Sequence, residues 1–501
     1  MASISLNHIK KVYPGDIEVI SDLNLQIKDK EFVVLVGPSG CGKSTLGRTI
    51  LQLYHQTYGR TMYYGRSLDD LAPKYVIDTV KNLKSRRAKL HELEQKRDKL
   101  EAEYAKLSET EQYAKHTELD TARKLAEDAL LDITKIVGGF LVVDDLDPVI
   151  AAYSKDYGIA RKISALEEKR QALQVDVDDA QYAKKTAEEA GKSEKSGQLE
   201  KAQEKLKQCD DQIAALRQQL DAGRQEIEAL RQPYASDPEF QKYEAYRDDG
   251  IDLARLEYNE MRRLRSDMQL IFQDPYSSLN PRMSVGQIIS EGMQAHNMIK
   301  KKDARMQQLV LNIMDECGLA PYFLHRFPHQ FSGGQRQRIG IARALATNPK
   351  FVVCDEAVSA LDVSIQAQII NLLLDLKEHQ NLTYMFITHD LSVVKYISDR
   401  VGVMYLGNMV ELAEADEIFH HPIHPYTEAL LNAIPTTDTV GAKELSILEG
   451  DIPSPVNPPK GCKFHTRCKY CTEICTQVVP AWEEVRPNHF VACHHKLEVK
   501  E

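Results

Sequence analysis

The sequence predicts an α/β fold, an open sheet with a ligand site along one edge, interrupted by a long helical insertion. Three observations lead to this fold class. Short apolar runs typical of buried strands alternate with helix-compatible segments. Polar or glycine-rich residues follow several of these runs at once, where open α/β sheets bind ligands. Residues 73–258 change to Lys, Glu, Gln, Ala and Leu, which is the composition of long helices.

The length and charge of the chain limit its class. Its 501 residues could form about three average domains, and its formal net charge of −10 argues against nucleic-acid binding over the whole surface. No basic start followed by an apolar core, and no run of about 18 apolar residues, is present. We therefore expect neither export by a signal peptide nor a membrane-spanning helix.

The first elements in order are two strands. Residues 4–13 alternate between apolar and polar side chains, as a half-buried strand does, and residues 19–27 are expected to form a second strand. Tyr13 ends the first strand, just before the turn residues Pro14 and Gly15. The pattern alone leaves two roles open for Tyr13, a ring that stacks on a base or an ordinary surface tyrosine.

A phosphate-binding loop follows the buried strand predicted over Phe32–Val36. Residues 37–45 read GPSGCGKST and match G-x-x-x-x-G-K-[ST], with a helix-compatible segment over residues 46–54. In this loop the backbone N–H groups surround an anion, Lys43 reaches the terminal phosphates and the Ser44 hydroxyl binds Mg²⁺. We expect the nucleotide to contact Gly37, Ser39, Gly40, Gly42, Lys43, Ser44 and Thr45.

The insertion contains two heptad runs, typical of coiled coils. The first has Leu90, Leu93, Leu100, Tyr104 and Leu107, and the second has Leu199, Leu206, Ile213, Leu220 and Ile227 with Ala202, Cys209, Leu216, Gly223 and Leu230. Residues 138–148 break the heptads and carry turn residues, so we place there the apex of a single antiparallel hairpin. Arms of about 55 residues would project on the order of 80 Å, with residues 191–197 bending the returning arm. The alternative is a set of shorter, solvated helices folded back on the core.

The second half of the chain returns to strands that end in polar residues. The expected elements are a strand over 268–272 before Gln273, a segment at 331–338 before a helix over 339–346, a strand over 351–354 before Asp355 and Glu356, a strand over 383–388 before His389, and a hairpin over 401–411 that turns at Gly407 and Asn408. Carboxyl ends of parallel strands meet at one sheet edge, so these polar residues are expected to lie near the phosphate loop.

The order of these motifs resembles the ATP-binding subunits of ABC transporters, everywhere except the insertion. The resemblance implies an ABC-type P-loop ATPase domain. It matches residues 37–45 to the Walker A loop, Gln273 to the Q-loop, Ser332, Gly333, Gly334 and Gln335 to the signature motif, Asp355 and Glu356 to Walker B, residues 359–362 to the D-loop and His389 to the switch histidine. In that family the aromatic residue before the first turn, Tyr13 here, stacks on adenine.

The resemblance also implies roles in ATP hydrolysis. Glu356 would act as general base on the attacking water, and His389 would contact the γ-phosphate. Lys43 and Mg²⁺, held by Ser44, Gln273 and indirectly Asp355, would neutralise the phosphate charge. The signature motif caps the ATP of an opposite subunit in that family, and Asp362 of the D-loop is expected beside nucleotide as well. Two such domains would therefore form the working unit.

Two regions are similar to the oligopeptide and dipeptide importer ATPases: residues 272–283, and the tail at 424–431 and 450–455. Residues 1–42 look more like the sugar-importer ATPases, so import of a sugar or oligosaccharide is the alternative. The implied partners are two integral-membrane permease subunits, a second ABC ATPase and an extracytoplasmic binding protein, with this chain peripheral on the cytoplasmic face of the cell membrane. The sequence is equally compatible with a homodimer of this chain and with a heterodimer with the second ATPase.

A DNA-acting ATPase similar to SMC or Rad50 is a weaker alternative. In that class the coil is far longer and lies between the Q-loop and the signature motif, and the repair proteins carry C-x-x-C at its tip. Here the insertion precedes Gln273, and residues 138–148 contain no cysteine. The acidic net charge also disfavours this class, and no nucleic acid is expected as a partner.

Five of the nine cysteines lie in the last forty residues, which suggests a metal before disulfides. Cys462, Cys468, Cys475 and Cys493 match four positions that ligate an iron–sulfur cluster in some members of the resembled subfamily. Four thiolates also suit Zn²⁺, and unliganded thiols remain a third possibility. The expected segments are a nucleotide-binding domain over 1–72 and 259–425, the insertion over 73–258, and a cysteine-rich extension over 426–501.

Overall fold

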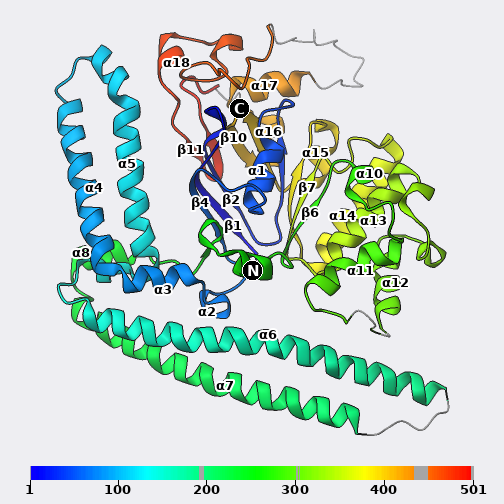
Figure 1. The fold of residues 1–501 in the computed structure, drawn as a ribbon. Coiled ribbons are helices and arrows are strands. Elements are labelled where there is room, and N and C mark those ends of the chain that lie inside the picture. The colour runs from blue at the N-terminus through cyan, green and yellow to red at the C-terminus, as the bar shows by residue number, and fades with distance from the viewer. Residues whose placement is uncertain (1, 191–196, 301–302, 304, 434–449, 498–501) are drawn as a thin grey trace. The chain divides into compact units, whose positions relative to one another are not determined.

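The computed structural model describes residues 2–190, 197–300, 303, 305–433 and 450–497 (Figure 1). The chain divides into two compact units. The first, here called the cassette unit, joins the residues up to Gly65 with those from Arg262 onward, and the second, the helical unit, is Arg66–Met261. No described helix is both long and apolar enough to cross a membrane.

The main sheet of the cassette unit has the strand order β11-β12-β10-β9-β3-β8-β7-β6. Strand β3 (Phe32–Val36) lies between β8 (Thr383–Ile387) and β9 (Arg400–Tyr405) and is parallel to both. Strands β7 (Phe351–Asp355) and β6 (Met268–Ile271) continue the parallel part. All residues of β3, β7, β8 and β9 are buried, which confirms the strands predicted from apolar runs.

The other side of the sheet is antiparallel. Strand β10 (Asn408–Glu414) forms the predicted hairpin with β9, and the C-terminal strands β12 (His489–Val491) and β11 (Glu483–Arg486) extend the sheet from β10. The side chains of Glu411 and His489 are at most 1% exposed, and His489 Nε2 lies 2.8 Å from Glu411 Oε1. This buried pair ties the C-terminal extension to the sheet.

A second, antiparallel sheet contains the N-terminal strands of the cassette unit. Strand β1 (Ile4–Tyr13) pairs with β2 (Ile17–Ile27) on one side and with β4 (Tyr58–Tyr63) on the other. The alternating burial of β1 and β2 agrees with their alternating sequence, so both predicted strands are confirmed.

A large hydrophobic core of the cassette unit includes residues of β3, β7 and β8 and of the helices between residues 285 and 432. The described helices of this unit lie before, within and after that range. They are α1 (Lys43–Ile50), α10 (Pro275–Ser278), α11 (Val285–Ala295), α12 (Met306–Glu316), α13 (Gly333–Leu345), α14 (Val363–Gln380), α15 (Leu391–Ile397), α16 (Ala415–His420), α17 (Pro425–Asn432) and α18 (Glu473–Gln477). Helix α13 begins six residues before the predicted start at residue 339, because Ser332 caps it.

The helical unit consists mainly of two helix pairs (Figure 1). Its elements are α2 (Leu68–Leu71), α3 (Lys74–Lys81), α4 (Leu83–Tyr104), α5 (Glu109–Val137), α6 (Asp147–Glu189), α7 (Gln198–Arg231), α8 (Pro238–Glu244) and β5 (Ile251–Asp252), while α9 (Tyr258–Leu264) spans the boundary. Helix α4 packs on α5, and α6 packs on α7.

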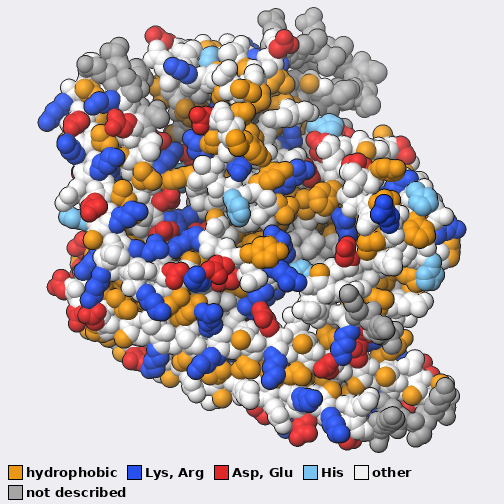
Figure 2. Space-filling view, in the orientation of Figure 1, with side chains coloured by type: hydrophobic (Ala, Val, Ile, Leu, Met, Phe, Trp, Pro, Cys, Tyr) orange, Lys and Arg blue, Asp and Glu red, His pale blue; other side chains and the backbone are white. Residues whose placement is uncertain are grey.

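Helix α7 packs on α6 through the second predicted heptad run. Its buried positions are Cys209, Ile213, Leu220, Gly223 and Ile227. Ion pairs between α6 and α7 flank this line of residues: Lys155–Glu226, Arg170–Asp210 and Arg217–Glu167. Figure 2 shows charges of both signs interspersed on the visible surface of these helices, as expected for a solvated face.

The predicted single hairpin with its apex at residues 138–148 is wrong. The chain already reverses after α4, at residues 105–108, and reverses again between α6 and α7. Gly138–Val142 instead forms a short 3₁₀ helix, in which Phe140 is fully buried against the edges of Phe240 and Tyr153. The apolar residues 140–143 explain the difference, because a projecting apex would expose them to water. Of the bend predicted at 191–197, residues 191–196 lie outside the described part of the chain.

Candidate active site

The phosphate-binding loop connects β3 to α1 within the cassette unit. Gly42, the last residue before α1, has φ of +103°, and a Cβ there would lie 2.9 Å from the carbonyl oxygen of Val19. Both constraints favour glycine. Lys43 is 5% exposed, and its Nζ donates hydrogen bonds to the carbonyl oxygens of Gly37 and Pro38 at 2.9 and 3.0 Å. Its ammonium group is therefore held against the loop that the motif assigns to phosphate.

Ser44 and Asp355 meet at the carboxyl end of β7. The Ser44 hydroxyl donates a 2.6 Å hydrogen bond to Asp355 Oδ1, and Arg48 Nη2 lies 3.4 Å from Asp355 Oδ2. Asp355 is 1% exposed. Arg48 was not among the predicted site residues, although its position four residues after Ser44 places both on one face of α1 and was a usable signal.

Glu356 lies between Gln273 and His389, two residues that are far from it in the sequence. Gln273 Nε2 donates to Glu356 Oε2 at 2.6 Å, and His389 Nδ1 lies 3.5 Å from Glu356 Oε1. The Glu356 side chain is 14% exposed and that of His389 is 54% exposed. Glu356 also has φ of +46°, and its N–H donates to the carbonyl of Ile387. A strained, non-glycine conformation of this kind is often found at functional sites.

The oxygen atoms at this edge suit Mg²⁺. Ser44, Asp355 and Gln273 supply hydroxyl, carboxylate and amide oxygens, which a hard cation prefers. Mg²⁺ in phosphate-transfer sites uses one or two protein ligands together with phosphate oxygens and water. In the described part of the chain, no group of three or more His, Cys, Asp or Glu side chains is arranged to hold a metal by itself, and such a site does not require one.

Tyr13 lies at the end of β1 beside Tyr54. The two ring centroids are 6.1 Å apart in an edge-on arrangement, and Lys11 Nζ lies 5.0 Å from the centre of the Tyr13 ring. Tyr54 in turn accepts a hydrogen bond from Arg48 on α1. Tyr13 is therefore linked to the helix of the phosphate loop through these side chains, and it is only partly buried.

The predicted signature residues lie beside the end of the D-loop, where α13 and α14 begin. Ser332 caps α13 and forms a reciprocal capping box with Gln335. A Cβ on Gly334 would clash with Ile365, and one on Gly333 would touch Leu361. Asp362 caps α14, and its pKa is lowered by hydrogen bonds from Ser364 and from the N–H of Ile365.

The D-loop adjoins both the Walker B residues and the signature residues. The N–H and the hydroxyl of Ser359 donate to the carbonyl oxygen of Glu356, and Leu361 lies beside Gly333. Within the described residues, no hydrogen bond or ion pair links Asp362 or residues 332–335 to residues 37–45.

The cysteine-rich extension brings its thiols near one another. The N–H of Cys462 donates to the carbonyl of Cys475 at 2.8 Å. Burial raises the pKa of Cys462 to about 11, and the neighbouring thiols of Cys475 and Cys468 contribute to the rise. Burial likewise raises the pKa of Cys493 to about 12, and the thiols of Cys462, Cys468 and Cys475 add smaller increases. The four thiols are neighbours, although the described side chains are not arranged around a metal position.

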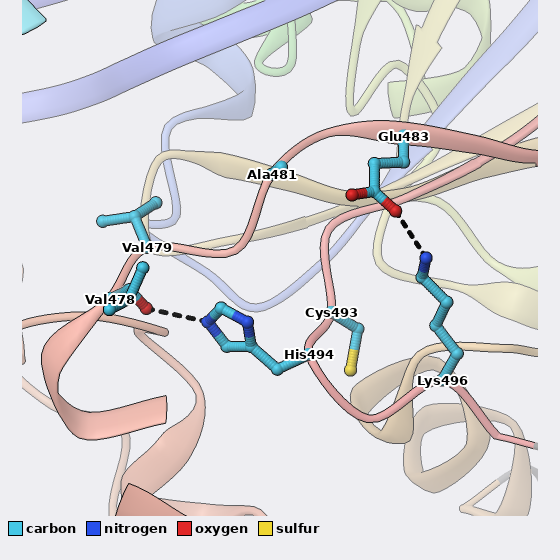
Figure 3. Close-up of a pocket in the computed structure, with 7 residues that line it drawn as sticks. All are labelled: Val478, Val479, Ala481, Glu483, Cys493, His494 and Lys496. Carbon is cyan, nitrogen blue, oxygen red and sulfur yellow. Dashed lines mark hydrogen bonds and ion pairs between the residues drawn. The ribbon is translucent and has the colours of Figure 1, made fainter. Parts of the chain in front are cut away.

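A pocket of about 400 Å³ lies beside Cys493 (Figure 3). It is lined by Val478, Val479, Ala481, Glu483, Cys493, His494 and Lys496. His494 Nε2 lies 2.9 Å from the carbonyl oxygen of Val478, and Lys496 pairs with Glu483. These polar groups already bind one another, so the pocket offers few free partners to a ligand.

Comparisons with known proteins agree with the order of the motifs. A family model described as "ABC transporter" matches residues 20–242 and 240–359, and one described as "Oligopeptide/dipeptide transporter, C-terminal region" matches residues 410–475. The oligopeptide transport ATP-binding protein AppF of Bacillus subtilis is 52% identical over 250 residues, which cover 49% of this chain and 75% of AppF.

A second relative is equally similar. The oligopeptide transport ATP-binding protein OppF of Salmonella typhimurium is 52% identical over 247 residues, which cover 49% of this chain and 73% of OppF. Among solved structures, the dimeric structure of MJ0796, a bacterial ABC transporter cassette, aligns with a TM-score of 0.42 and 16% identity, over 82% of this chain and 98% of that one.

Proposed function

The chain belongs to the ABC transporter family, and from this premise we propose that it is the ATP-hydrolysing subunit of an importer for oligopeptides or dipeptides. The observation that carries the ATPase part is the meeting of Gln273, Glu356 and His389 beside the Ser44–Asp355 pair. The match of residues 410–475 to the oligopeptide/dipeptide transporter region supports the class of cargo.

In the proposed reaction the chain positions water against the γ-phosphate and neutralises charge. Glu356 accepts a proton from the attacking water, and Gln273 holds the Glu356 carboxylate in place. His389 contacts the γ-phosphate, and Lys43 binds phosphate oxygens. Ser44, Gln273 and indirectly Asp355 would hold Mg²⁺, which supplies further neutralisation of phosphate charge when bound. The hydrogen bonds of 2.6 Å from Gln273 to Glu356 and from Ser44 to Asp355 support this assignment.

The exposure of Ser332 and Gly333 at the start of α13 supports a working unit of two such subunits. Ser332, Gly333 and Gly334 begin α13, whose first N–H groups form an anion-binding helix N-terminus. We infer that Ser332, Gly333, Gly334, Gln335 and Asp362 act on the nucleotide of an opposite subunit, while Tyr13 stacks on the adenine of the nucleotide in its own subunit.

The proposed import function requires partners. They are two integral-membrane permease subunits, a second ABC ATPase subunit and an extracytoplasmic binding protein, with this chain on the cytoplasmic face of the membrane. The test is affinity purification of the full chain from its own cells in mild detergent. Recovery of polytopic membrane subunits with a second ATPase would support the importer, whereas recovery of only soluble proteins or nucleic acid would contradict it.

We further infer that α6 and α7 form an antiparallel coiled coil within a separate inserted domain. The seven-residue spacing of Ile213, Leu220 and Ile227, all buried, supports the coiled coil. The division of the chain at residues 66 and 261 supports an inserted domain close to residues 73–258. The remaining segments would be 1–72 with 259–425 as the nucleotide-binding domain and 426–501 as the extension.

We also infer that Cys462, Cys468, Cys475 and Cys493 bind an iron–sulfur cluster, with Zn²⁺ as the alternative. Their mutual proximity supports this inference. Binding would require the thiols to turn toward one another and to lose their protons. Assays of iron, acid-labile sulfide and zinc on anaerobically purified protein test it. Zinc alone would exclude the cluster, and the absence of both metals would exclude the site.

A further inference from the structure

Lys463 reaches from the cysteine-rich extension to the turn between β9 and β10. Its Nζ donates a 2.8 Å hydrogen bond to the carbonyl oxygen of Leu406 and a second one to the hydroxyl of Ser21 on β2. Lys463 therefore connects three segments of the cassette unit that are far apart in the sequence. Sequence analysis gave it no role, because a lysine between a cysteine and a phenylalanine carries no recognisable pattern.

The backbone on the C-terminal side of Lys463 is firmly placed. Phe464 is 2% exposed and belongs to the main hydrophobic core. Its ring centroid lies 5.3 Å from those of Tyr405 and Tyr426. Because this anchor fixes where the chain passes, the Lys463 side chain does not have to be ordered by its two hydrogen bonds alone.

The turn that Lys463 holds lies directly on the phosphate-binding loop. The N–H of Gly407 donates to the carbonyl of Cys41 at 2.9 Å, and the N–H of Ser21 donates to the carbonyl of Gly407 at 3.3 Å. Gly407 has φ of +83°, and a Cβ there would overlap the carbonyl oxygen of Val19. The same carbonyl faces Gly42, so the turn, β2 and the end of the loop form one close-packed layer of backbone.

Two charged groups near Lys463 act on its ammonium in opposite directions. Glu18 attracts the ammonium, whereas Lys10, which pairs with Glu18 at 2.6 Å, repels it. A partly buried ammonium is costly to leave without acceptors, which favours retention of the Leu406 and Ser21 hydrogen bonds. Loss of these contacts would free the carbonyl of Leu406 and the turn attached to it.

We propose that Lys463 is a positioning residue for nucleotide binding, which braces the Leu406–Gly407 turn against Cys41 and Gly42. The C-terminal extension and the phosphate-binding loop then stabilise each other, so nucleotide binding strengthens the attachment of the extension. The proposal takes from the proposed function only the binding of nucleotide by residues 37–45. It does not depend on the transported cargo or on a metal at the cysteines.

The test compares Mg-ADP binding to the full chain and to three variants by calorimetric titration, with KM and kcat for ATP. K463M removes the ammonium, K463R keeps charge and donors, and K469M removes a lysine of the same extension whose Nζ pairs with Glu428 at 3.0 Å. We expect K463M to weaken Mg-ADP binding and raise KM roughly tenfold, as for a lost charge-assisted hydrogen bond, with kcat changed by less than about twofold. K463R should recover part of the affinity, and K469M should match the unaltered chain.

Equal Mg-ADP affinity of K463M and the unaltered chain would overturn the proposal, while nucleotide binding by the unaltered chain would leave the proposed function intact. If K463M does not fold, hydrogen exchange of the unaltered chain decides the question. Mg-ADP should then slow amide exchange at residues 461–464 and 406–407 together. Protection of residues 37–45 without any change at 461–464 would contradict the coupling.

Discussion

Glu356, the proposed general base, is contacted by two residues that are far from it in the sequence. Gln273 binds one carboxylate oxygen at 2.6 Å and His389 lies 3.5 Å from the other. Its carboxylate, rather than its size or hydrogen bonds, should therefore be essential for hydrolysis. Replacing the carboxylate by an amide of the same shape separates these properties.

We expect E356Q to lower the rate of phosphate release from Mg-ATP by at least about 100-fold, the usual contribution of a general base. Nucleotide affinity should change little, because the phosphate loop is intact. The matched control is E378Q, which makes the same change at an exposed position of α14. A rate for E356Q equal to that of E378Q would exclude Glu356 as the base.

The candidate residues of this site were easier to select from the sequence than the residues that contact them. The motifs indicated Lys43, Ser44, Gln273, Asp355, Glu356 and His389 because each follows a strand or a glycine-rich loop in a recognisable order. Arg48 and Lys463 could not be assigned a role with the same ease. Arg48 follows Ser44 by one helical turn, but its contact with Asp355, like that of Lys463 with Leu406, joins residues far apart in the sequence.

Among the elements, the α6–α7 pair contains one poorly matched position. Asp156 is 8% exposed, its Oδ1 has no hydrogen-bond partner in the described structure, and a Cβ on Gly223 would overlap that oxygen. The pKa of Asp156 is raised from 3.8 to about 6, mainly by burial, with Lys155 opposing the rise and Glu226 contributing to it. Gly223 therefore makes room for a carboxyl group whose charged form is disfavoured.

The pH dependence follows from the raised pKa. The folded helices bind the Asp156 proton more tightly than the unfolded chain, so this contribution to stability is full below pH 3.8 and is lost as the pH rises to about 6. We expect D156N, which stays neutral, to stabilise the helical unit by roughly 1–3 kcal/mol at pH 7.5, with little gain at pH 4.

Urea unfolding followed by helical circular dichroism at the two pH values measures the D156N effect. The control is D211N, the same change at an exposed position of α7. A D156N gain that is equal at both pH values would mean that packing, and not the charge on Asp156, limits the pairing of α6 and α7.

The helices of the insertion were predictable from composition and heptads, but their connections were not. Residues 138–148 carry turn signals, and those signals say nothing about whether a turn is exposed. Phe140 instead packs under Arg231, whose Cζ lies 5.1 Å from the ring centre, and Arg231 pairs with Glu244 at 2.8 Å. The contact of Phe140 with Arg231 joins residues 91 positions apart, so short-range periodicity could not reveal it.

At the scale of the whole molecule, the insertion leaves and re-enters the cassette unit at neighbouring points. Lys350 Nζ donates to the carbonyl of Gly65 at 2.7 Å and lies 3.6 Å from Asp267 Oδ2, to which the hydroxyl of Tyr63 also donates. One lysine thus contacts both Gly65 and Asp267, which favours the replacement of Arg66–Met261 by a short connection. The entropy of closing a loop changes only slowly with its length.

We expect a chain in which a short Gly/Ser linker replaces Arg66–Met261 to fold and to hydrolyse ATP within about threefold of the full chain, since a short linker costs little. Phosphate release and Mg-ADP titration measure this, and E356Q in the shortened chain serves as the inactive control. A shortened chain that folds but does not bind Mg-ADP would show that the helical unit contributes to the nucleotide site.

The pairing of β3 has a consequence for synthesis of the protein. Strand β3 is fully buried between β8 and β9, which follow it by roughly 350 residues. At about 5–20 residues per second, a ribosome needs roughly 20–70 s to reach them. The helical unit is contiguous in the sequence and can fold within that interval, whereas the apolar β3 has no partner strands until they are synthesised. The nascent chain therefore exposes an aggregation-prone segment through most of translation. The rate of elongation and the supply of chaperones should then determine the yield of folded protein.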